Sequence, residues 1–429
     1  MLPAGIINTG LRIDMASMTQ QFDLVIIGGG MVGTALAAAL GGTDMKVALI
    51  EAQVPSVPAS QAMTSVSDAD VRVSALNRAS QQFLEQLGAW QRIPQERLSP
   101  YDKMRVWDGE GTARIQFDAI ELGEAHLGYI VENVHTASAL MQSFQQHGNL
   151  QLFAPAKVTG LEKDPLPTSP NAKQDWLIRL ADGQTLCAPL VVGADGARSR
   201  VRQWAELQTR EWDYDHHGLV CTVQVDKSHQ KGAWQRFTES GVLAFLPLAD
   251  DNLCSIVWSC PEEQANELLV LDDDAFCVAL TKAFETQLGH VQSVGPRAAI
   301  PLRQRHAKRY SKDGIVLVGD AAHTIHPLAG QGVNLGLMDA YVLADELKAA
   351  RSRGVKLNHD QVLNRYERRR MPDNLAMMAT MEGFKRLFAA KQPLLRWVRN
   401  WGMDKVNGLG AIKHHLIQEA MGLNKRIKV

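Results

Sequence analysis

The sequence has 429 residues, more than one ordinary hydrophobic core holds, so we expect at least two domains. Its 45 Lys and Arg nearly cancel its 46 Asp and Glu, and the formal net charge of -1 gives no general attraction to nucleic acid. The five cysteines lack the spacing of zinc sites, so we expect no metal, no disulfides and a cytoplasmic location.

The N-terminal residues 1–17 contain no sustained apolar run and no small-residue cleavage site, so we expect no secretory signal, and Met18 is a candidate start. No window approaches the roughly 18 apolar residues that a membrane-spanning helix requires. We therefore expect a protein that is soluble or peripheral to a membrane.

The first predicted unit is a βαβ motif. Residues 22–27 are rich in strand formers and end in a glycine turn, and an Ala/Leu-rich helix is predicted over 32–40. A second strand, 46–50, ends at Glu51, and the Pro/Ser-rich segment 53–69 indicates an exposed loop. This order is typical of a nucleotide-binding domain.

The glycine turn has the spacing Gly28-x-Gly30-x-x-Gly33. The first glycine permits a tight turn, the second lets the backbone approach a pyrophosphate at the helix N-terminus, and the third allows close helix packing. Glu51, at the next strand end, could accept hydrogen bonds from both ribose hydroxyls and would repel a 2′-phosphate. A glycine turn alone occurs by chance, but this combination predicts a dinucleotide site.

The middle of the chain predicts a second domain. Strand-like runs dominate about 155–192 and again 217–260, and we expect mostly antiparallel sheet there. Apolar strands that end in Gly/Asp turns return at 190–196 and 315–320, so the nucleotide-binding domain is predicted to be discontinuous in sequence. After Gly332 the chain is predicted to be mainly helical.

Breaks in this helical region are expected near Pro372, Pro393 and Gly408, because proline and glycine interrupt helices.

The segment around Asp320 favours a flavin. Its carboxylate follows an apolar strand and could accept hydrogen bonds from ribityl hydroxyls, with helix capping as the alternative. Gly330 and Gly332 leave backbone N–H groups open before a helix that begins near Asn334. Such a helix N-terminus, aimed at flavin N1 and C2=O, would stabilise negative charge there. An ordinary loop before a helix is the alternative.

Three segments resemble the motifs of the class A flavoprotein monooxygenases. They are Gly28–Gly33, Gly193-Ala-Asp-Gly-Ala-Arg-Ser199 and Gly319-Asp-Ala-Ala-His-Thr-Ile-His-Pro-Leu-Ala-Gly-Gln-Gly-Val-Asn-Leu-Gly336. With 70–76, 127–133 and 212–217, the chain resembles the ubiquinone-biosynthesis FAD-dependent hydroxylase family, particularly the VisC-like 2-polyprenylphenol hydroxylases, over about residues 20–423.

The resemblance implies an α/β fold like that of para-hydroxybenzoate hydroxylase. A Rossmann-like FAD-binding domain, discontinuous in sequence, would carry an inserted, mostly antiparallel β-sheet substrate domain and a helical C-terminal region. The expected FAD-binding parts are 20–95, 126–210 and 306–355, the substrate-domain parts are 96–125 and 211–305, and the C-terminal helical region is 356–429.

The resemblance also implies which residues contact the cofactor: Gly28, Gly30, Gly33, Glu51, Arg72, Asn133, Asp195, Gly319, Asp320, Pro327, Gly330, Gly332, Val333 and Asn334. Asp195 is expected to contact FAD and to help with the pyridine nucleotide, with an Asp-Gly turn as the alternative. Arg72 matches a position near the flavin, with a surface arginine as the alternative. Glu132 and Asn133 match a stretch beside the FAD pyrophosphate.

The implied reaction uses reduced FAD and O2 to form a C4a-hydroperoxide, whose distal oxygen passes to an electron-rich phenol ring. NAD(P)H is the expected electron donor. The protein must exclude water and hold the ring near the flavin. Pro327 is expected near the flavin, and His326 is a candidate base, although loop histidines commonly just satisfy backbone groups. His216-His217 is a weaker candidate.

Two runs, 245–248 and 254–258, could line an apolar substrate pocket, although alternating apolar residues in a strand are more often core. The stretch 384–429 carries ten Lys and Arg against Asp404 and Glu419. It could lie on anionic lipid at the inner face of the cytoplasmic membrane and pass a polyprenyl tail to the pocket, or its helices could pack on the first domain.

The leading hypothesis is hydroxylation of a polyprenylated phenol in ubiquinone biosynthesis, with a biosynthetic protein complex as a further expected partner. One alternative is a flavin hydroxylase of a small soluble aromatic. Another is a flavin-bearing assembly subunit without turnover. The ring position, the prenyl length and the choice among NADH, NADPH and a protein electron donor stay open.

Overall fold

The computed structural model describes residues 19–109, 111, 114–165, 174–238, 240–324 and 332–389. Within these residues, no helix combines the length and the apolar character needed to cross a bilayer.

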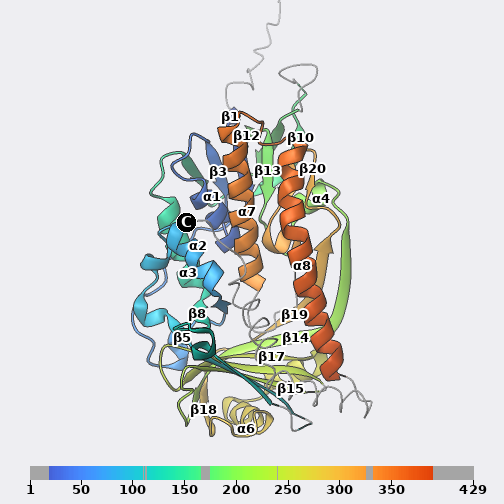
Figure 1. The fold of residues 1–429 in the computed structure, drawn as a ribbon. Coiled ribbons are helices and arrows are strands. Elements are labelled where there is room, and N and C mark those ends of the chain that lie inside the picture. The colour runs from blue at the N-terminus through green and yellow to red at the C-terminus, as the bar shows by residue number, and fades with distance from the viewer. Residues whose placement is uncertain are drawn as a thin grey trace, which may run out of the picture.

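A six-stranded sheet forms the centre of the upper half of the molecule in Figure 1. In spatial order its strands are β20 (Ser311–Lys312), β21 (Ile315–Leu317), β13 (Leu190–Gly193), β2 (Leu24–Ile27), β3 (Val47–Ile50) and β9 (Leu150–Phe153). Every neighbouring pair is parallel except β20 with β21. β2 and β3 are buried throughout, as expected for parallel strands that are covered on both faces.

The helices beside this sheet are α1 (Met31–Ala39), α3 (Asn133–Phe144) and α7 (Gly332–Ser352), and α1 contacts both of the others. Small residues bring α1 and α7 close together. A Cβ on Gly336 of α7 would lie 2.6 Å from Cγ2 of Val32, and one on Gly319 would lie 3.2 Å from the same atom. Glycine at both positions therefore lets the later segments approach the start of α1.

Two small sheets flank this unit. The three-stranded sheet has the order β4 (Val73–Leu76), β8 (Gly128–Glu132) and β5 (Ser99–Tyr101). The four-stranded sheet has the order β1 (Thr19–Gln21), β12 (Thr185–Ala188), β11 (Trp176–Leu180) and β10 (Val158–Lys163). The short helices in this part of the chain include α2 (Arg78–Gln86), α4 (Arg200–Trp204), η2 (Val66–Asp68), η3 (Trp90–Arg92), η4 (Gln95–Arg97) and η5 (Ala119–Leu122).

A nine-stranded sheet lies below, and α6 covers the face turned away from α7 (Figure 1). Its strands are β22 (His323–Thr324), β19 (Ala298–Ala307), β14 (Thr209–Val225), β17 (Leu253–Pro261), β16 (Gly241–Pro247), β15 (Gly232–Thr238), β6 (Lys103–Asp108) and β7 (Arg114–Asp118), with β18 (Val291–Val294) paired to β14. Only β15 and β6 pair in parallel. The Rossmann-like unit and the mostly antiparallel sheet confirm the predicted fold class.

The two faces of this sheet bury different residues. Phe245, Cys254 and Trp258 pack in a core with α5 (Glu262–Val270) and α6 (Asp273–Ala283). Leu246 and Val257, which alternate with them, pack on the opposite face. The predicted apolar pocket segments therefore contribute to two packed cores, one on each face of the sheet, because side chains along a strand point to opposite faces.

The last described helix, α8 (Asp360–Ala389), runs from the six-stranded sheet to the nine-stranded one (Figure 1). The predicted break near Pro372 is wrong, because α8 continues through this proline. The break lies between α7 and α8, where Gly354 adopts a positive φ of 67°. Packing of α8 along α7 and a side-chain cluster around Arg370 compensate for the hydrogen bond that proline cannot donate. Pro393 and Gly408 lie outside the described residues.

Candidate functional site

The carboxyl ends of three parallel strands lie side by side. Ile27 of β2 pairs with Gly193 of β13, and Gly193 pairs with Leu317 of β21. The three segments that follow these strands, from widely separated parts of the sequence, therefore leave the sheet at one edge. Ligands of parallel α/β sheets bind at this edge.

The glycine turn after β2 is built for close approach. Gly28 has a φ of +112°, and a Cβ there would lie 2.3 Å from the carbonyl oxygen of Ala194. A Cβ on Gly33 would lie 2.0 Å from the carbonyl oxygen of Gly28. Gly30, by contrast, has nothing within 4 Å of a built Cβ. The open side of the turn, before the N-terminus of α1, fits a pyrophosphate.

Glu51 follows β3, the neighbour of β2. Its Oε2 accepts a hydrogen bond of 2.6 Å from the backbone N–H of Gly29, and its Oε1 accepts one of 3.0 Å from that of Gln53. The carboxylate is thus held against the glycine turn. Each oxygen keeps a further lone pair, with which it could accept a hydrogen bond from a ribose hydroxyl.

Asp195 follows β13, and its two carboxylate oxygens have different surroundings. One fits a local turn or helix-start role, and the other fits contact with a ligand. Its Oδ2 accepts hydrogen bonds from the backbone N–H groups of Arg200 at 2.7 Å and Val201 at 3.1 Å, which ties it to the start of α4. Its Oδ1 is buried and has no hydrogen-bond partner among the described residues. A buried carboxylate oxygen of this kind calls for a donor from a ligand.

Gly319 and Asp320 follow β21 in the short helix η6 (Gly319–Ala321). The Asp320 side chain keeps exposed surface, yet the protein packed around it displaces water and raises the pKa of its carboxyl. The charges of His323 and Arg72 act in the opposite direction. Arg72 is therefore close enough to Asp320 for their charges to interact, although it comes from a remote part of the sequence.

The stretch at Glu132 and Asn133 has a structural role. Glu132 is buried, and its carboxylate contacts Arg97 Nη1 at 3.2 Å and accepts a hydrogen bond from the backbone of Asp70. Burial alone would raise the pKa of Glu132, but hydrogen bonds, the first from His135, and the Arg97 charge lower it. Asn133 begins α3, and its backbone N–H donates to the carbonyl oxygen of Arg72.

Asn334 lies in the first turn of α7, after Gly332 and Val333, but its side chain is buried away from solvent. Its Oδ1 accepts hydrogen bonds from Asn77 N at 3.1 Å and Ser80 Oγ at 2.7 Å, and its amide donates to Ala75 O at 2.7 Å. The side chain therefore anchors α7 to β4 and α2. The Asn334 side chain is therefore not available to a flavin, whereas the backbone of this turn is not tied up by these contacts.

Three predicted residues, His326, Pro327 and Gly330, lie outside the described residues, as does most of the basic stretch 384–429.

The predicted His216-His217 pair lies on β14. The Nε2 of His216 contacts the carbonyl oxygen of Ser240 at 3.1 Å, and Nδ1 of His217 is buried without a partner among the described residues. The sheet face opposite α6 carries further polar groups. Gln235 and Thr222 are only 5% and 3% exposed, and Gln235 Nε2 and Thr222 Oγ1 have no partner in the described part of the chain.

Sequence reasoning missed Asp339, which lies on α7 behind the third segment. The carboxylate is fully buried, and its Oδ2 accepts a 3.0 Å hydrogen bond from the backbone N–H of Gly319. Burial alone would raise the pKa of Asp339, but the charges of His323 and Arg370 lower it far below the ordinary value. An acidic residue on the apolar side of a predicted helix, directly after the motif, was the available signal.

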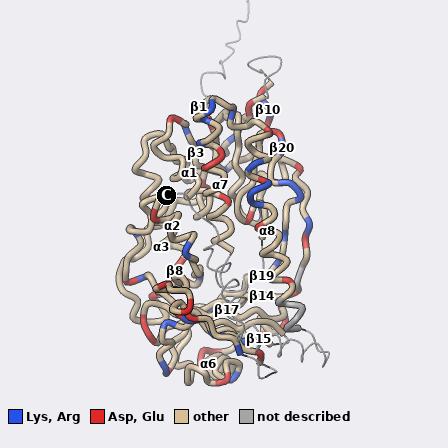
Figure 2. Tube along the Cα trace, viewed as in Figure 1, with Lys and Arg blue, Asp and Glu red and all other residues tan. Residues whose placement is uncertain are grey.

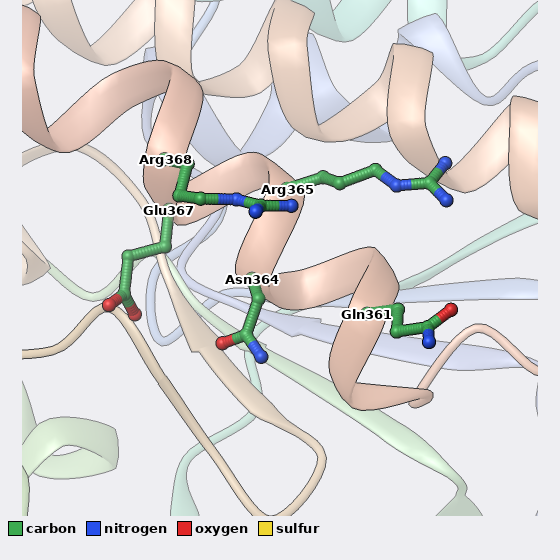
Figure 3. A pocket seen from close by; sticks show the side chains of 5 residues that line it. All are labelled: Gln361, Asn364, Arg365, Glu367 and Arg368. Carbon is green, nitrogen blue, oxygen red and sulfur yellow. The ribbon is translucent and has the colours of Figure 1, made fainter.

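A surface pocket of about 570 Å³ lies elsewhere, on α8, and its lining side chains project from neighbouring turns of that helix (Figure 3). They are Gln361, Asn364, Arg365, Glu367 and Arg368. Arg309 already pairs with Glu367 at 2.7 Å and bonds to Asn364 at 3.0 Å. Figure 2 places Lys and Arg residues near this part of the molecule, but none of the predicted cofactor residues lines the pocket.

The residues at the sheet edge fit FAD. The open glycine turn could hold a pyrophosphate, and Glu51 could bind the adenosine ribose. The unpartnered oxygen of Asp195 and the partly desolvated carboxyl of Asp320 could accept further hydrogen bonds from the cofactor. Two acceptors at remote positions of the sequence meet at one edge, as an elongated ligand with many hydroxyl groups requires.

Comparison with known proteins agrees with this geometry. The model of the FAD binding domain family matches residues 21–380. The chain is 38% identical to the 3-demethoxyubiquinol 3-hydroxylase of Escherichia coli K12, over 94% of this chain and 99% of that protein. It is 35% identical to the ubiquinone hydroxylase UbiL of Rhodospirillum rubrum, over 94% and 90% of the two chains.

It is also 32% identical to the human mitochondrial ubiquinone biosynthesis monooxygenase COQ6, over 94% and 93% of the two chains. The fold is similar to that of p-nitrophenol 4-monooxygenase PnpA from Pseudomonas putida DLL-E4, with a TM-score of 0.75 at 19% identity over 95% of this chain and all of that one. With this flavin site and these relatives, the chain belongs to the FAD-dependent ubiquinone-biosynthesis hydroxylases among the class A flavoprotein monooxygenases.

Proposed function

We propose that this protein hydroxylates the ring of a polyprenylated phenol during ubiquinone biosynthesis, using FAD, O2 and electrons from NAD(P)H. The observation that carries the proposal is the assembly of one flavin site from the ends of β2, β13 and β21. The names of the relatives in Escherichia coli and Rhodospirillum rubrum support the substrate class.

FAD, when bound, supplies O2 activation and oxygen transfer. The protein's own residues bind and orient it. Backbone N–H groups near Gly30 would hold the pyrophosphate, Glu51 the adenosine ribose and Asp320 the ribityl chain. Burial raises the pKa of Asp320, and the nearby charges of His323 and Arg72 offset part of that rise. Asp195 would contact FAD through its unpartnered oxygen.

The substrate ring is proposed to lie between this site and the nine-stranded sheet. Gln235 Nε2 and Thr222 Oγ1 are buried donors without partners among the described residues, and they share the face opposite α6. β16 and β17 separate β15 from β14, so one substrate oxygen cannot reach both donors. Leaving a buried donor unpaired costs roughly 1–3 kcal/mol, and a phenol oxygen beside Gln235 would remove that cost there. The same arrangement supports the domain division predicted above, with 96–125 and 211–305 contributing the substrate domain.

We also propose a peripheral contact with the cytoplasmic face of the membrane. A polyprenyl tail is sparingly soluble in water, and the stretch 384–429 carries ten Lys and Arg beside large apolar residues. Such a surface binds anionic lipid by charge and by apolar burial together.

The experiment that tests the function is quinone-intermediate profiling in cells that lack the gene. A prenylated phenol one oxygen short should accumulate, and the wild-type gene should clear it. Accumulation of a small unprenylated aromatic would favour a soluble substrate instead. Complementation by a variant whose FAD cannot be reduced would favour an assembly subunit without turnover.

A further inference from the structure

A buried ionic cluster lies behind residues 319–324, the segment that follows β21 and contains Asp320, and the proposed reaction does not use this cluster. Its centre is Asp339 of α7, which meets Arg370 and Asn374 of α8. Their exposed fractions are 0%, 1% and 0%. Charges removed from water to this degree persist only when each one has close partners, so the arrangement of the cluster is tightly determined.

The carboxylate of Asp339 links two separate parts of the structure. Its Oδ2 lies 3.0 Å from the backbone nitrogen of Gly319 and 2.5 Å from Nε2 of His323. Its Oδ1 lies 2.7 Å from Nε of Arg370 and 3.2 Å from Nδ2 of Asn374. One oxygen therefore contacts residues 319–324, and the other contacts α8.

Arg370 is held in turn by α8 and α7. Its Nη2 donates to the carbonyl oxygen of Leu335 at 3.2 Å and to Asn374 at 2.8 Å, and its Nη1 pairs with Asp373 at 2.9 Å. All three of its nitrogens have partners, so the guanidinium cannot turn away from Asp339 without losing several charge-assisted hydrogen bonds.

Asp320 lies between the two points that Asp339 holds. Gly319 precedes it with a φ of +58°, a left-handed conformation that sets the direction of the next peptide, and His323 follows at the start of β22. Asp339 contacts Gly319 and His323, which lie on either side of Asp320 in the sequence. The Asp320 side chain itself does not take part in these contacts, and it keeps exposed surface.

We propose that Asp339 and Arg370 are positioning residues for the cofactor site: through Gly319 and His323 they hold the turn that presents Asp320 to the ribityl chain of FAD. This inference rests on the placement of FAD proposed above. α8 contributes to FAD affinity in this way without touching the cofactor.

The test compares apoproteins carrying Arg370→Met, Arg370→Lys and the matched control Arg369→Met. Arg369 is adjacent on α8 but pairs with Asp345 and Glu346, at 2.6 and 2.8 Å. We expect Arg370→Met to raise the FAD dissociation constant at least tenfold and Arg370→Lys to raise it less. Arg369→Met should stay within twofold of wild type. Fluorescence titration of FAD with apoprotein measures these constants.

Hydrogen exchange of the apoprotein separates positioning from general loss of stability. In Arg370→Met, peptides covering 317–324 should exchange faster while those covering 24–27 of β2 keep their protection. An unchanged FAD constant with unchanged exchange at 317–324 would overturn the proposal. So would uniform loss of protection across both regions.

Two further variants keep the test decisive. If Arg370→Met does not fold, the double variant Asp339→Asn/Arg370→Met removes both charges, and wild-type FAD affinity in it would overturn the proposal. Asp320→Ala tests the placement of FAD itself. Wild-type affinity in that variant contradicts both the placement and this inference, whereas weakening by Asp320→Ala but not by Arg370→Met contradicts the inference alone.

Discussion

Asp320 combines a cost to the empty protein with a gain in the proposed complex. Desolvation raises the pKa of its carboxyl, so the folded chain disfavours the ionised form, which is the stronger acceptor for a ribityl hydroxyl. A raised pKa means that the apoprotein loses stability as the pH rises from the ordinary value, near 4, through the raised one. In the proposed complex, hydrogen bonds from FAD to Asp320 would offset this loss.

Replacing Asp320 with Asn should therefore have opposite effects on stability and binding. We expect the apoprotein to melt at a higher temperature at neutral pH, because the disfavoured charge is gone. FAD binding should weaken about tenfold or more, since a hydrogen bond to a charged acceptor contributes roughly 1.5–3 kcal/mol. Thermal melting with and without FAD checks both effects, with the exposed Asp251→Asn as control. A lower melting temperature of the apoprotein would contradict the argument.

Gly28→Ala should abolish FAD binding. The new methyl group would lie 2.3 Å from the carbonyl oxygen of Ala194, and the φ of +112° is one that side chains rarely adopt. Strain of this kind costs on the order of 1–3 kcal/mol before the clash is counted. The purified variant should be colourless, whereas Gly148→Ala, which has open space around it, should stay yellow. A yellow Gly28→Ala protein would refute this description of the turn.

Gln235→Leu tests the proposed substrate face. Removing an amide whose buried Nε2 lacks a partner among the described residues should raise the melting temperature of the free protein, while KM for the prenylated phenol should rise about three- to tenfold. The exposed Gln224→Leu, on β14 of the same sheet, is the control and should change neither quantity. Steady-state kinetics with stability measurements decide the matter, and an unchanged KM would remove Gln235 from the site.

At the scale of elements, β19 joins the nine-stranded sheet to the ionic cluster. His306 near its end is buried, and its Nε2 lies 3.0 Å from the hydroxyl of Tyr310, which also bonds to Asn374 at 3.1 Å. Burial, with smaller contributions from the charges of His323 and Arg210, lowers the pKa of His306 to about 4. The neutral imidazole is therefore the form compatible with the fold.

This pKa predicts acid sensitivity with a definite range. A histidine whose pKa falls from about 6.5 in the unfolded chain to about 4 in the fold contributes stability that is complete above pH 6.5. It is lost as the pH falls towards 4, and amounts to about 3 kcal/mol. Urea unfolding between pH 4.5 and 7.5 should reveal this slope. His306→Gln should flatten it and the exposed His290→Gln should not; equal slopes in all three proteins would contradict the assignment.

Local pattern predicted elements well where one interaction dominates. The strand before Gly28, the turn and the helix after it were visible because apolar runs and glycines carry the signal within a few residues. The continuation of α8 through Pro372 was not visible in the sequence. Packing against α7 and the contacts of Arg370 outweigh the helix-breaking tendency of proline, and both depend on the tertiary structure. Which core Phe245 and Leu246 each pack into was equally hidden, because it depends on which elements cover each face of the sheet.

At the scale of the whole molecule, the sequence predicted the fold class and the cofactor because three motifs recur in fixed order. It did not reveal that the Asn334 side chain forms hydrogen bonds with β4 and α2. Nor did it reveal that Asp339 accepts a hydrogen bond from the backbone of Gly319. Such contacts join residues that only the completed topology brings together. The domain boundaries and the contacts of individual site residues with FAD stay predictions.

The basic stretch 384–429 predicts an association that depends on lipid charge. Replacing Lys391, Arg396 and Arg399 together with Glu should abolish flotation with phosphatidylglycerol vesicles, because each basic residue near an anionic surface contributes about 1 kcal/mol. FAD content should be unchanged. Wild-type protein should not float with phosphatidylcholine alone. Equal flotation of wild type and variant would contradict a role of this stretch in lipid binding.

The order in which β2, β13 and β21 occur along the chain has a consequence for biosynthesis. A nascent polypeptide that has not yet emerged beyond Gly319 possesses the glycine turn and Asp195 but lacks the third wall of the site. We therefore expect flavin loading to wait until the segment after β21 has been synthesised, and truncated products that end before Gly319 to lack the cofactor.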